Sequence, residues 1–374
     1  MRIAMFGQKR IPSREGGVEI VVEELSTRMA VLGHKVTCYN RRGHHVSGSQ
    51  YDTFTEKEYK NVRIKTVPTI EKKGLAAVSS SFFSSLCSLF GKYDVVHIHA
   101  EGPAAFCFIP KLFRKRVVVT VHGLDWQREK WKSGFGAKYI HFGEKMAVKH
   151  ADEIIVLSKG VQRYFMDTYG RETVFIPNGV NRPEIKPADI INKRFGLSKD
   201  SYILYLGRIV PEKGEHYLIE AFKQTDTDKR LVIAGGSSDT DEYMDRLKKM
   251  AQDDERIIFT GFVQGQMLEE LYSNAYIYVL PSDLEGMPLS LLEAMSYGNC
   301  CLVSDIKECT EVVEDKAEVF RKSDIDDLRM RLQELCSRED LVQKYKEDAA
   351  EYICGRYDWN KIVDKTLELY KGER

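Results

Sequence analysis

The sequence contains no hydrophobic run long enough to cross a membrane. A membrane-spanning helix needs about 18 consecutive apolar residues, and no stretch of the 374 residues reaches that length without polar interruptions. The chain also opens directly with a short apolar segment, residues 2–7, of the kind that forms a strand. We therefore expect neither a transmembrane segment nor a signal peptide.

The cysteines lack any spacing that would bind a metal or form a disulfide framework. There are eight: Cys38, Cys87, Cys107, Cys300, Cys301, Cys309, Cys336 and Cys354. None of them forms the closely paired motif of a zinc site, and most lie in apolar segments. We expect reduced thiols in the core of a cytoplasmic protein.

The chain carries no net charge, yet its two halves differ. Residues 1–180 contain 28 Lys and Arg against 17 Asp and Glu, a net charge of +11, and the remaining residues contain 28 against 39, a net charge of −11. A chain of this length is too long for one ordinary core, so we expect two domains with different partners. Residues 181–200 are polar and contain two prolines, which indicates a linker between the domains.

Short apolar runs alternate with helix-like segments along the whole chain. In the first half the expected strands are residues 2–7, 35–39, 94–99, 116–122, 154–158 and 173–177. In the second half they are residues 202–206, 230–234, 256–260, 276–280 and 300–304. Continuous apolar runs of this length are typical of parallel strands buried on both faces. The alternation therefore predicts two doubly wound α/β sheets facing each other across a cleft.

The stretch from residue 280 to residue 295 is the most informative segment. A polar loop follows a buried strand, and Pro288 suits the first turn of a helix that Gly298 would end. The loop and the helix each carry a glutamate, Glu285 and Glu293. Ligands bind at the carboxyl ends of such strands, and carboxylates accept hydrogen bonds from sugar hydroxyls beside a helix N-terminus that favours phosphate. On spacing alone, an equally good interpretation is that neither glutamate binds a ligand. In that case the helix dipole would favour one glutamate at the N-terminus of the helix, and the other would lie on a solvated face.

Two cations follow another predicted strand of the same domain. Arg208 directly follows Gly207, and Lys213 precedes Gly214. Arg offers a fork of donors to phosphate oxygens and Lys a compact charge. Because both follow strands of one parallel sheet, both would share its ligand-binding edge with Glu285. The pattern favours a diphosphate site without metal, although solvated surface cations are the common alternative.

Three Asp-x-Asp pairs have the form that often holds a metal on a diphosphate. They are Asp226/Asp228, Asp239/Asp241 and Asp324/Asp326. All three lie in polar, loop-like sequence between elements. We interpret them as solvated surface and expect neither a metal nor a cofactor.

Histidines and glycines at strand ends indicate a second candidate site in the first half. His97 and His99 share one face of a predicted strand, but without a third ligand they are best interpreted as packed core histidines. His122 ends the next strand and is expected to line the cleft. Gly16 and Gly17 open a helix and would let a ligand approach the backbone closely, unless they form only a turn.

In this order the motifs resemble the retaining nucleotide-sugar glycosyltransferases of glycosyltransferase family 4, which have the GT-B fold of two Rossmann-like domains. The matching motifs are Gly16-Gly17, His122, Asn178-Gly179-Val180, Gly207-Arg208 with Lys213-Gly214, Gly261-Phe262, Glu285 with Glu293, and Tyr357-Asp358-Trp359. The resemblance covers nearly the whole chain. It implies an acceptor-binding domain at residues 1–180, a donor-binding domain at residues 181–355, and a helix at residues 356–374 that returns to the first domain.

The resemblance also implies roles for the matching residues. Arg208 and Lys213 would bind the donor diphosphate, Glu285 would orient the transferred sugar, and these three residues would act in catalysis with His122. Glu293 would bind the ribose. The remaining donor contacts would come from Gly17, Gly261, Val263, Gly286, Met287, Pro288 and Leu289, and the acceptor contacts from Gly16, Gly17 and Asp125. One departure concerns Asp125, because many relatives have an aspartate directly after the histidine.

Residues 5–18, 40–45 and 122–126 look similar to a bacterial polysaccharide subgroup that includes capsule rhamnosyltransferases. This suggests dTDP-rhamnose as the donor, with UDP- or GDP-sugars as alternatives, a lipid-linked saccharide as the acceptor, and no nucleic acid partner. No carboxylate pair clearly flanks the reacting bond as in a glycosidase, so we expect same-face attack assisted by the donor phosphate. Two rivals are a nucleotide-sugar 2-epimerase of the same fold and a non-catalytic nucleotide-sugar binding protein.

Two stretches of the basic half favour peripheral binding to the inner face of the cell membrane. Residues 72–92 are apolar with basic ends, and residues 111–116 carry four cations. Phe82, Leu86, Leu89 and Phe90 recur at helical spacing and would form one apolar stripe. Packing of that stripe against the sheet of its own domain is an equally good interpretation.

Overall fold

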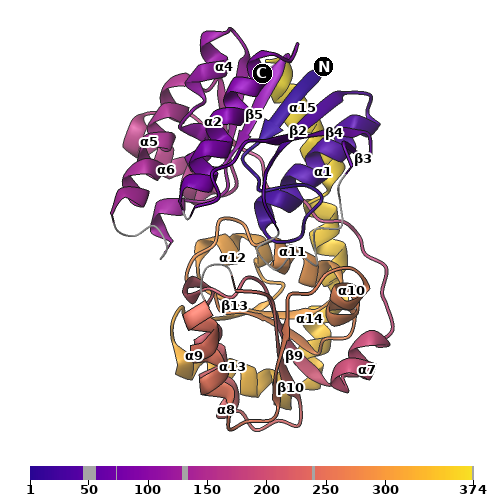
Figure 1. Ribbon diagram of the computed structural model, residues 1–374. Coiled ribbons are helices and arrows are strands. Elements are labelled where there is room, and N and C mark those ends of the chain that lie inside the picture. Colours follow the sequence, from indigo (N-terminus) through magenta and orange to yellow (C-terminus); the bar gives the residue numbers. More distant parts are fainter. Residues whose placement is uncertain (45–55, 73, 129–133, 238–240, 373–374) are drawn as a thin grey trace. The chain divides into compact units, whose positions relative to one another are not determined.

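The computed structural model describes residues 1–44, 56–72, 74–128, 134–237 and 241–372. The chain divides into two compact units. Unit 1 contains Met1–Gly179 together with Trp359–Arg374, and unit 2 contains Val180–Asp358. Figure 1 shows a sheet with helices on its faces in each unit, which confirms the predicted α/β class.

Unit 1 is built on an eight-stranded sheet in the order β3-β4-β2-β1-β5-β6-β7-β8. Its strands are β1 (Arg2–Phe6), β2 (Lys35–Arg41), β3 (Glu58–Tyr59), β4 (Val62–Val67), β5 (Val95–His99), β6 (Arg116–Val121), β7 (Glu153–Val156) and β8 (Val174–Phe175). All neighbouring pairs are parallel except β3 and β4. The sequence did not predict β3 and β4, because β4 alternates buried and exposed residues and has no continuous apolar run.

The helices of unit 1 follow the local start and stop signals. They are α1 (Gly17–Val31), α2 (Leu75–Leu89), α3 (Glu101–Ala104), α4 (Phe108–Leu112), η2 (Asp125–Gln127), α5 (Phe135–His150), α6 (Lys159–Tyr169) and α15 (Trp359–Lys371). The Ser158 hydroxyl caps α6 by accepting a hydrogen bond from the Val161 N–H at 3.2 Å. Gly170 then ends α6 in the left-handed conformation, as a C-terminal glycine commonly does.

The C-terminal helix α15 belongs to unit 1, where it packs against α1. The Tyr370 hydroxyl lies 2.5 Å from Nδ1 of His97, and the Arg116 guanidinium donates to the Leu369 carbonyl oxygen at 2.8 Å. A Cβ atom on Gly179 would lie 2.5 Å from the Trp359 ring, so only glycine allows this approach. The last helix is therefore an integral part of the unit 1 core.

Unit 2 is built on a six-stranded, fully parallel sheet in the order β11-β10-β9-β12-β13-β14. Its strands are β9 (Tyr202–Leu206), β10 (Arg230–Ala234), β11 (Ile257–Gly261), β12 (Ile277–Leu280), β13 (Cys300–Ser304) and β14 (Glu318–Phe320). Its helices are α7 (Ile190–Phe195), η4 (Pro211–Lys213), α8 (Glu215–Lys223), α9 (Asp241–Ala251), α10 (Gln266–Ser273), α11 (Leu289–Ser296), α12 (Lys307–Val313), α13 (Ile325–Ser337) and α14 (Glu339–Arg356).

Residues 181–189 of the expected linker are irregular and mostly exposed, whereas the chain from Ile190 forms α7 and packs within unit 2, so the prediction was wrong for that second part. The N–H groups of Ile190 and Ile191 donate to the buried Glu270 carboxylate at 2.7 and 3.0 Å. This carboxylate satisfies donors at the start of α7 and fixes the helix on α10. Polar composition indicated a linker here because the packing of α7 depends on a single buried acceptor 79 residues further along the chain, which leaves no local pattern.

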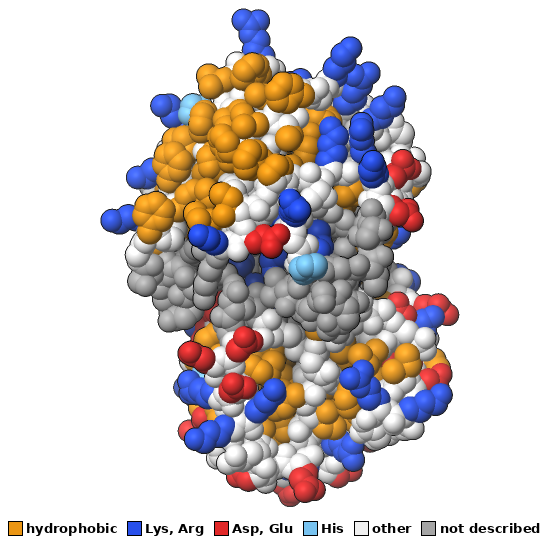
Figure 2. Space-filling view, viewed as in Figure 1, with side chains coloured by type: hydrophobic (Ala, Val, Ile, Leu, Met, Phe, Trp, Pro, Cys, Tyr) orange, Lys and Arg blue, Asp and Glu red, His pale blue; other side chains and the backbone are white. Residues whose placement is uncertain are grey.

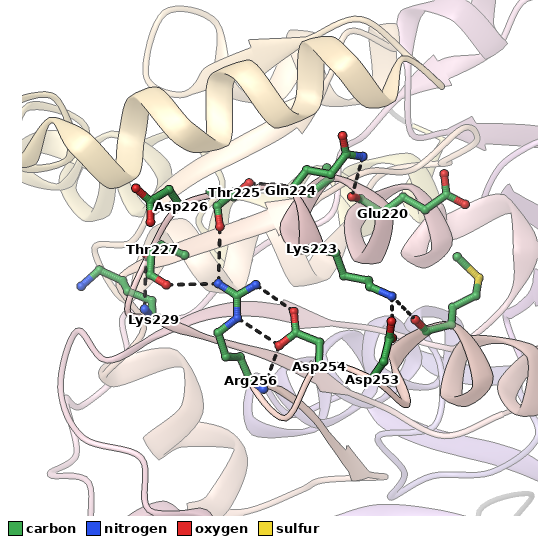
Figure 3. A network of polar contacts seen from close by, with 12 residues as sticks. Glu220, Lys223, Gln224, Thr225, Asp226, Thr227, Lys229, Asp253, Asp254 and Arg256 are labelled. Atoms are coloured by element: carbon green, nitrogen blue, oxygen red, sulfur yellow. Dashed lines mark hydrogen bonds and ion pairs between the residues drawn. The ribbon is translucent and has the colours of Figure 1, made fainter.

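A polar network joins the amino ends of β10 and β11 (Figure 3). The Arg256 guanidinium donates to the carbonyl oxygens of Thr225 and Thr227 at 3.4 and 3.2 Å, and to the Asp254 carboxylate at 2.8 Å. These loops lie at the edge of the sheet opposite the carboxyl ends of the strands. The network therefore supports the fold and lies away from the candidate donor residues.

The Asp-x-Asp pairs behave largely as predicted. Asp226, Asp228 and Asp326 are exposed, whereas Asp324 caps α13 by accepting a hydrogen bond from the Asp327 N–H at 2.9 Å. Asp239 lies outside the described residues. All eight cysteines are free thiols, and five of them are buried.

Candidate active site

The loop from Gly207 to Gly214, here called the donor loop, lies across the carboxyl ends of β9 and β10. The Gly207 N–H donates to the Ala234 carbonyl oxygen at 3.0 Å, and the Ile209 N–H donates to that of Gly236 at 3.1 Å. A Cβ atom on Gly235 would lie 1.8 Å from the Gly207 carbonyl oxygen. Glycine at position 235 is thus required for the two loops to touch.

The donor loop also contacts the loop that follows β12. A Cβ atom on Gly214, where φ is +74°, would lie 2.1 Å from the Pro281 carbonyl oxygen. The Asp283 N–H donates to the Glu212 carbonyl oxygen at 2.9 Å. These contacts bring Lys213 and Glu285 together, as the shared sheet edge predicted.

The ammonium group of Lys213 forms a hydrogen-bonded ion pair with Oε1 of Glu285. The Ser282 hydroxyl donates to the same carboxylate oxygen at 2.7 Å. Both charged side chains are mostly removed from water, with 15% and 6% of their surface exposed. Because removing two charges from water is costly, a pair of this kind is weak evidence for stability and points to a role in function.

The segment from Gly286 to Leu289 leads into α11 at the same edge. Pro288 has extended backbone angles and occupies the N-cap, so it precedes the first turn instead of lying in it as predicted. Met287 and Leu289 are buried, and α11 ends at Ser296, followed after its C-cap Tyr297 by Gly298 with φ of +77°. Within α11, the Glu293 carboxylate accepts a hydrogen bond from the Tyr272 hydroxyl at 3.2 Å.

Gly261 and Val263 occupy the next position along the edge. The Gly235 N–H donates to the Gly261 carbonyl oxygen at 3.0 Å, and Gly261 has φ of +71°. Val263 is buried directly after this turn. The structure therefore brings the predicted donor residues of unit 2 onto the adjoining loops after β9, β10, β11 and β12.

In unit 1, His122 follows β6 and lies at the end of a row of buried histidines. Its Nε2 is 3.1 Å from Nδ1 of His99, whose ring centroid is 4.0 Å from that of His97. Nε2 of His97 contacts the Thr120 hydroxyl at 2.7 Å. His97 and His99 are packed core residues, as predicted. Among the residues that the structure describes, no group of three or more His, Cys, Asp or Glu side chains is arranged to hold a metal ion.

The histidines of this row are neutral at physiological pH. Burial lowers the pKa of His97 to about 3, and repulsion between the protonated forms of His97 and His122 opposes protonation further. Burial also lowers the pKa of His122 to about 3, with a smaller contribution from the Arg128 charge. His122 is thus a neutral hydrogen-bonding group, and an uncharged imidazole is what it can present to a substrate.

Two buried glutamates beside this row were not found from the sequence. The Glu101 carboxylate accepts a hydrogen bond from the Asp125 N–H at 2.8 Å and so fixes the loop after His122. Burial, the Asp125 charge and the adjacent Glu144 raise the pKa of Glu101 well above its usual range. A Cβ atom on Gly143 would lie 1.9 Å from the Glu101 carbonyl oxygen, so α3 and α5 pack unusually closely here. Isolated glutamates in separate elements give no spacing signal.

Asp125, predicted on the acceptor side, forms an ion pair with Arg128 at 3.0 Å. Gly16 is the N-cap of α1, and Gly17 is exposed as the first residue of that helix. A Cβ atom on Gly16 would lie 2.6 Å from Glu19, whose carboxylate accepts a hydrogen bond from the Lys9 N–H at 2.8 Å. The loop before α1 is thereby folded over its N-terminus.

Helix α2 packs with its serine face inward. The buried positions are Ser79, Ser80, Ser81, Ser84, Ser85 and Ser88. Several of these hydroxyls bond to carbonyl oxygens of the preceding turn, such as Ser81 to Ala77 at 2.6 Å and Ser88 to Ser85 at 2.6 Å. These bonds satisfy the hydroxyls of Ser79, Ser80, Ser81 and Ser88 and lower the cost of burying this face, whereas the buried Ser85 hydroxyl has no hydrogen-bond partner among the described residues. The alternative that the apolar stripe packs on the sheet is wrong for Phe82 and Phe90, which are 37% and 90% exposed.

Large hydrophobic side chains therefore gather on the surface of unit 1 formed by α2, α4 and α5 (Figure 2). We call this set the apolar face; it comprises Leu75, Phe82, Phe90, Leu112, Phe113, Phe135 and Phe142. Lys72, Lys92 and Arg114 are exposed beside these helices, and Lys73 lies outside the described residues. No helix in the described part of the chain is long and apolar enough to cross a membrane.

Two of the cations expected to face lipid are held by the protein instead. The Lys115 ammonium donates to the Tyr93 carbonyl oxygen at 3.0 Å, and Arg116 binds Leu369 in the C-terminal helix. The expectation is therefore corrected for Lys115 and Arg116. Their role is to fix the ends of strands in unit 1.

Two protein families match the chain in succession. Residues 15–182 match the family described as Glycosyltransferase Family 4. Residues 188–352 match the family described as Glycosyl transferases group 1. The first match lies in unit 1 and the second in unit 2.

Similar proteins span nearly the full chain. An uncharacterized glycosyltransferase of Methanocaldococcus jannaschii is 26% identical, over 99% of this chain and 98% of its own. A UDP-Gal:alpha-D-GlcNAc-diphosphoundecaprenol alpha-1,3-galactosyltransferase of Escherichia coli is 28% identical, over 83% of this chain and 84% of its own. The crystal structure of Anabaena HepE in complex with UDP-glucose matches with a TM-score of 0.81 at 16% identity, over 100% of both chains.

The two parallel sheets and these matches define the chain as a glycosyltransferase with the GT-B fold. It is an enzyme of the hexosyltransferase class, in which one segment matches Glycosyltransferase Family 4 and the next matches Glycosyl transferases group 1.

Proposed function

We propose that the enzyme transfers a sugar from a nucleotide-diphosphate sugar to a lipid-linked saccharide in polysaccharide biosynthesis, with retention of anomeric configuration. Unit 2 binds the donor and unit 1 binds the acceptor. The observation that carries this proposal is the cluster of adjoining loops in unit 2 that holds Arg208, the Lys213–Glu285 pair and α11 at one sheet edge. Cations for a diphosphate and carboxylates for hydroxyls on one edge match the chemistry of a nucleotide sugar.

On the donor side, Arg208 and Lys213 bind the two phosphates. The Lys213 ammonium has three N–H donors, and its bond to Glu285 uses one of them, so a phosphate oxygen has further donors to accept from. Glu285 accepts hydrogen bonds from hydroxyls of the transferred sugar, and Glu293 accepts them from the ribose. The Gly261–Val263 backbone meets the base, and the amides from Gly286 to Leu289 meet sugar or phosphate.

The reaction breaks the bond between the anomeric carbon and the diphosphate oxygen. Negative charge grows on that oxygen in an oxocarbenium-like transition state, and Arg208 and Lys213 stabilise it there more than in the ground state. The acceptor hydroxyl forms the new bond to the anomeric carbon on the same face, and its proton passes to the oxygen of the departing diphosphate. The charges come from the chain itself, so the step needs no metal.

On the acceptor side, Gly16 and Gly17 let substrate approach the backbone of unit 1, with Gly17 by the phosphates. His122 acts as a neutral donor or acceptor to the sugar, and Asp125 contributes to acceptor binding. A lipid-linked acceptor also explains the apolar face of unit 1 and the exposed cations beside it, because both suit the surface of an anionic leaflet. The enzyme then works as a peripheral protein on the inner face of the cell membrane.

Two observations on similar proteins support the substrate classes. The Escherichia coli relative is named for a UDP-sugar donor and a diphosphoundecaprenol-linked acceptor, and HepE was crystallised with UDP-glucose. We favour dTDP-rhamnose as the donor because residues 5–18 and 122–126 resemble capsule rhamnosyltransferases. UDP- and GDP-sugars are the alternatives.

A donor screen tests the proposal. The enzyme is incubated with dTDP-rhamnose, UDP-glucose, UDP-galactose and GDP-mannose, each with a lipid-diphosphate saccharide, and the product linkage is determined by NMR. Transfer with retained configuration is the expected result. Formation of a new nucleotide sugar without acceptor would identify a 2-epimerase, and binding without turnover for every donor would identify a non-catalytic binding protein.

A further inference from the structure

A buried glutamate adjoins the donor loop and has no role in the proposed chemistry. Glu215 is the first residue of α8, directly after Gly214, and its side chain is fully buried. The carboxylate lies between two tyrosine hydroxyls, with its Oε1 2.8 Å from Tyr205 and its Oε2 3.0 Å from Tyr243. No salt bridge is formed by Glu215 in the described part of the chain.

The hydrogen bonds continue beyond both tyrosines. The Tyr205 hydroxyl lies 3.0 Å from the carbonyl oxygen of Arg208, inside the donor loop. The Tyr243 hydroxyl lies 2.8 Å from Nδ1 of His216. Four links therefore connect His216, Tyr243, Glu215, Tyr205 and the Arg208 backbone in one chain.

Counting protons shows which state of Glu215 satisfies every link. The Arg208 carbonyl only accepts, so the single proton of Tyr205 must point to it. The link between Tyr205 and Glu215 is then filled only by a proton on Glu215. At the other end, Tyr243 donates to Glu215 and accepts from an Nδ1–H of neutral His216. When Glu215 is ionised, the Tyr205 proton can serve either the carboxylate or the Arg208 carbonyl, but not both.

Both states of Glu215 are accessible near neutral pH. Burial raises its pKa to about 7, opposed by the two tyrosine hydroxyls and by the nearby Lys213 charge. The other ionisable or charged groups that act on this chain are Tyr278, Glu285, Arg246, Glu220 and Asp283. They come from β12, from the loop after β12, and from helices α8 and α9.

We propose that Glu215 is a positioning residue for the donor site, which in its protonated form holds the Arg208 backbone in place through Tyr205. The proposal rests on the proposed function, in which Arg208 and Lys213 bind the donor diphosphate. Ionisation of Glu215 takes the Tyr205 proton away from the Arg208 carbonyl and places a negative charge near Lys213. Both changes oppose diphosphate binding, so donor affinity decreases as pH rises.

The same coupling requires that donor binding take up protons. If protonation of Glu215 strengthens donor binding, then donor binding must raise the affinity of Glu215 for its proton by the same factor. At a pH near the pKa of Glu215, binding therefore draws a fraction of a proton from the buffer. Calorimetry in two buffers of different ionisation enthalpy measures this uptake directly on the unmodified enzyme.

The test compares affinities by calorimetry with UDP-glucose and with dTDP-rhamnose as probes. The diphosphate of a nucleotide sugar is esterified at both ends and lacks the ionisation near pH 6 of a terminal phosphate, so any pH dependence belongs to the protein. For the wild type we expect the Kd to rise by about 3- to 10-fold across neutral pH, the range for one lost hydrogen bond. Glu215→Gln should bind the probes at every pH with a Kd near the low-pH value of the wild type, because an amide donates to Tyr205 and accepts from Tyr243 at every pH. Tyr205→Phe should bind the probes at every pH with a Kd near the high-pH value of the wild type.

Glu347→Gln is the matched control, because Glu347 is an exposed glutamate of α14 and is not among the charged groups that act on the hydrogen-bonded chain. Its profile should follow the wild type. A Glu215→Gln enzyme that keeps the wild-type pH dependence, or a wild type that takes up no proton on binding, overturns the proposal. If Glu215→Gln does not fold, the wild-type proton uptake decides alone. Arg208→Ala distinguishes failure of the proposed donor site from failure of the proposed role of Glu215. Unchanged donor affinity in that variant overturns the donor site itself. Weakened affinity in that variant, together with no proton uptake by the wild type, overturns only the role of Glu215.

Discussion

The ammonium group of Lys213 and the carboxylate of Glu285 form an ion pair in a part of unit 2 where both are largely shielded from water. The two residues are separated by 72 positions in the chain and meet because the loops after β9 and β12 touch through Gly214 and Pro281. A nearly buried charge pair is sensitive to the loss of either partner, since the remaining charge is left unpaired.

Glu285→Ala and Arg208→Ala should each reduce turnover by about 100-fold or more while the fold is retained. The physical reason is that misplacement of the sugar or of the diphosphate alone can cost that factor. Turnover with the donor identified by the screen is the measurement, and circular dichroism shows whether each variant is folded. Near-normal turnover in a folded variant would remove that residue from the site.

Gly235→Ala should raise the donor KM by about 10-fold or more. A methyl group there meets the Gly207 carbonyl oxygen and must displace the donor loop, and strained backbone of this kind costs about 1–3 kcal/mol. Gly355→Ala is the control, because that glycine lies in α14 with open space around its Cβ position and a helical alanine is favourable. Equal KM values for the two variants would contradict this account of the loop.

Turnover should be unaffected by EDTA and should not be increased by Mg²⁺ or Mn²⁺. The expected reason is that Arg208 and Lys213 supply the positive charge that a metal provides on the diphosphate in other transferases. Initial rates after extensive dialysis against the chelator provide the measurement. Loss of activity with EDTA and recovery with a divalent cation would show that a metal is required.

Binding to vesicles should depend on the apolar face and on salt. Phe90→Ser combined with Leu112→Ser and Phe113→Ser should reduce co-sedimentation with phosphatidylglycerol vesicles several-fold. Changing Lys72, Lys92 and Arg114 to Glu should also reduce it, because each cation near an anionic leaflet contributes roughly 1 kcal/mol. High salt should weaken binding of the wild type.

The matched control for the vesicle experiment is the pair Ile185→Ser and Met330→Ser, which removes two exposed hydrophobic side chains from unit 2. This variant should sediment like the wild type. Equal sedimentation with neutral and anionic vesicles, or no change in the apolar-face variant, would exclude docking through this surface.

The free energy of unfolding of unit 1 should fall as the pH is lowered, because its buried histidines are neutral in the folded chain. His97 and His122 have a pKa of about 3 in the folded chain, against roughly 6.5 when unfolded. Between these values the unfolded chain binds more protons, so the free energy of unfolding falls as pH falls, by about 1.4 kcal/mol per pH unit for each group. His97→Gln should make the dependence shallower by one proton, measured by urea unfolding between the two pKa values, whereas exposed His44→Gln should leave it unchanged.

Much of the fold was predictable because parallel strands buried on both faces appear as continuous apolar runs. The strand at Cys300–Ser304 was predicted to the residue, and α1 begins at Gly17, within the glycine pair that was expected to open a helix. Strand β4 was missed because only one of its faces is buried. The orientation of α2 was not predictable, since both a serine face and a phenylalanine face have helical spacing. The buried side was decided by the internal hydrogen bonds of the serines and by close packing, which only the folded chain shows.

The grouping of the candidate donor residues at one sheet edge was predictable because strand ends, glycines and charges coincide in the sequence. Position along the chain placed Arg208, Lys213 and Glu285 at one sheet edge, and the structure brings their loops together. Glu101 and Glu215 could not be found in this way. Each is a single acidic residue whose importance comes from burial and from partners on distant elements.

The placement of α15 has a consequence for biosynthesis of the chain. Unit 2 is an insertion within unit 1, since the sequence leaves unit 1 at Gly179 and re-enters it at Trp359. During translation, every residue of unit 2 is therefore synthesised before α15 exists, and His97 acquires its Tyr370 partner only after the whole of unit 2 has been made. The half that begins first is thus the half that finishes last, which reverses the usual N-terminal-first order. Shortening the chain from its C-terminal end should accordingly damage unit 1 and spare unit 2.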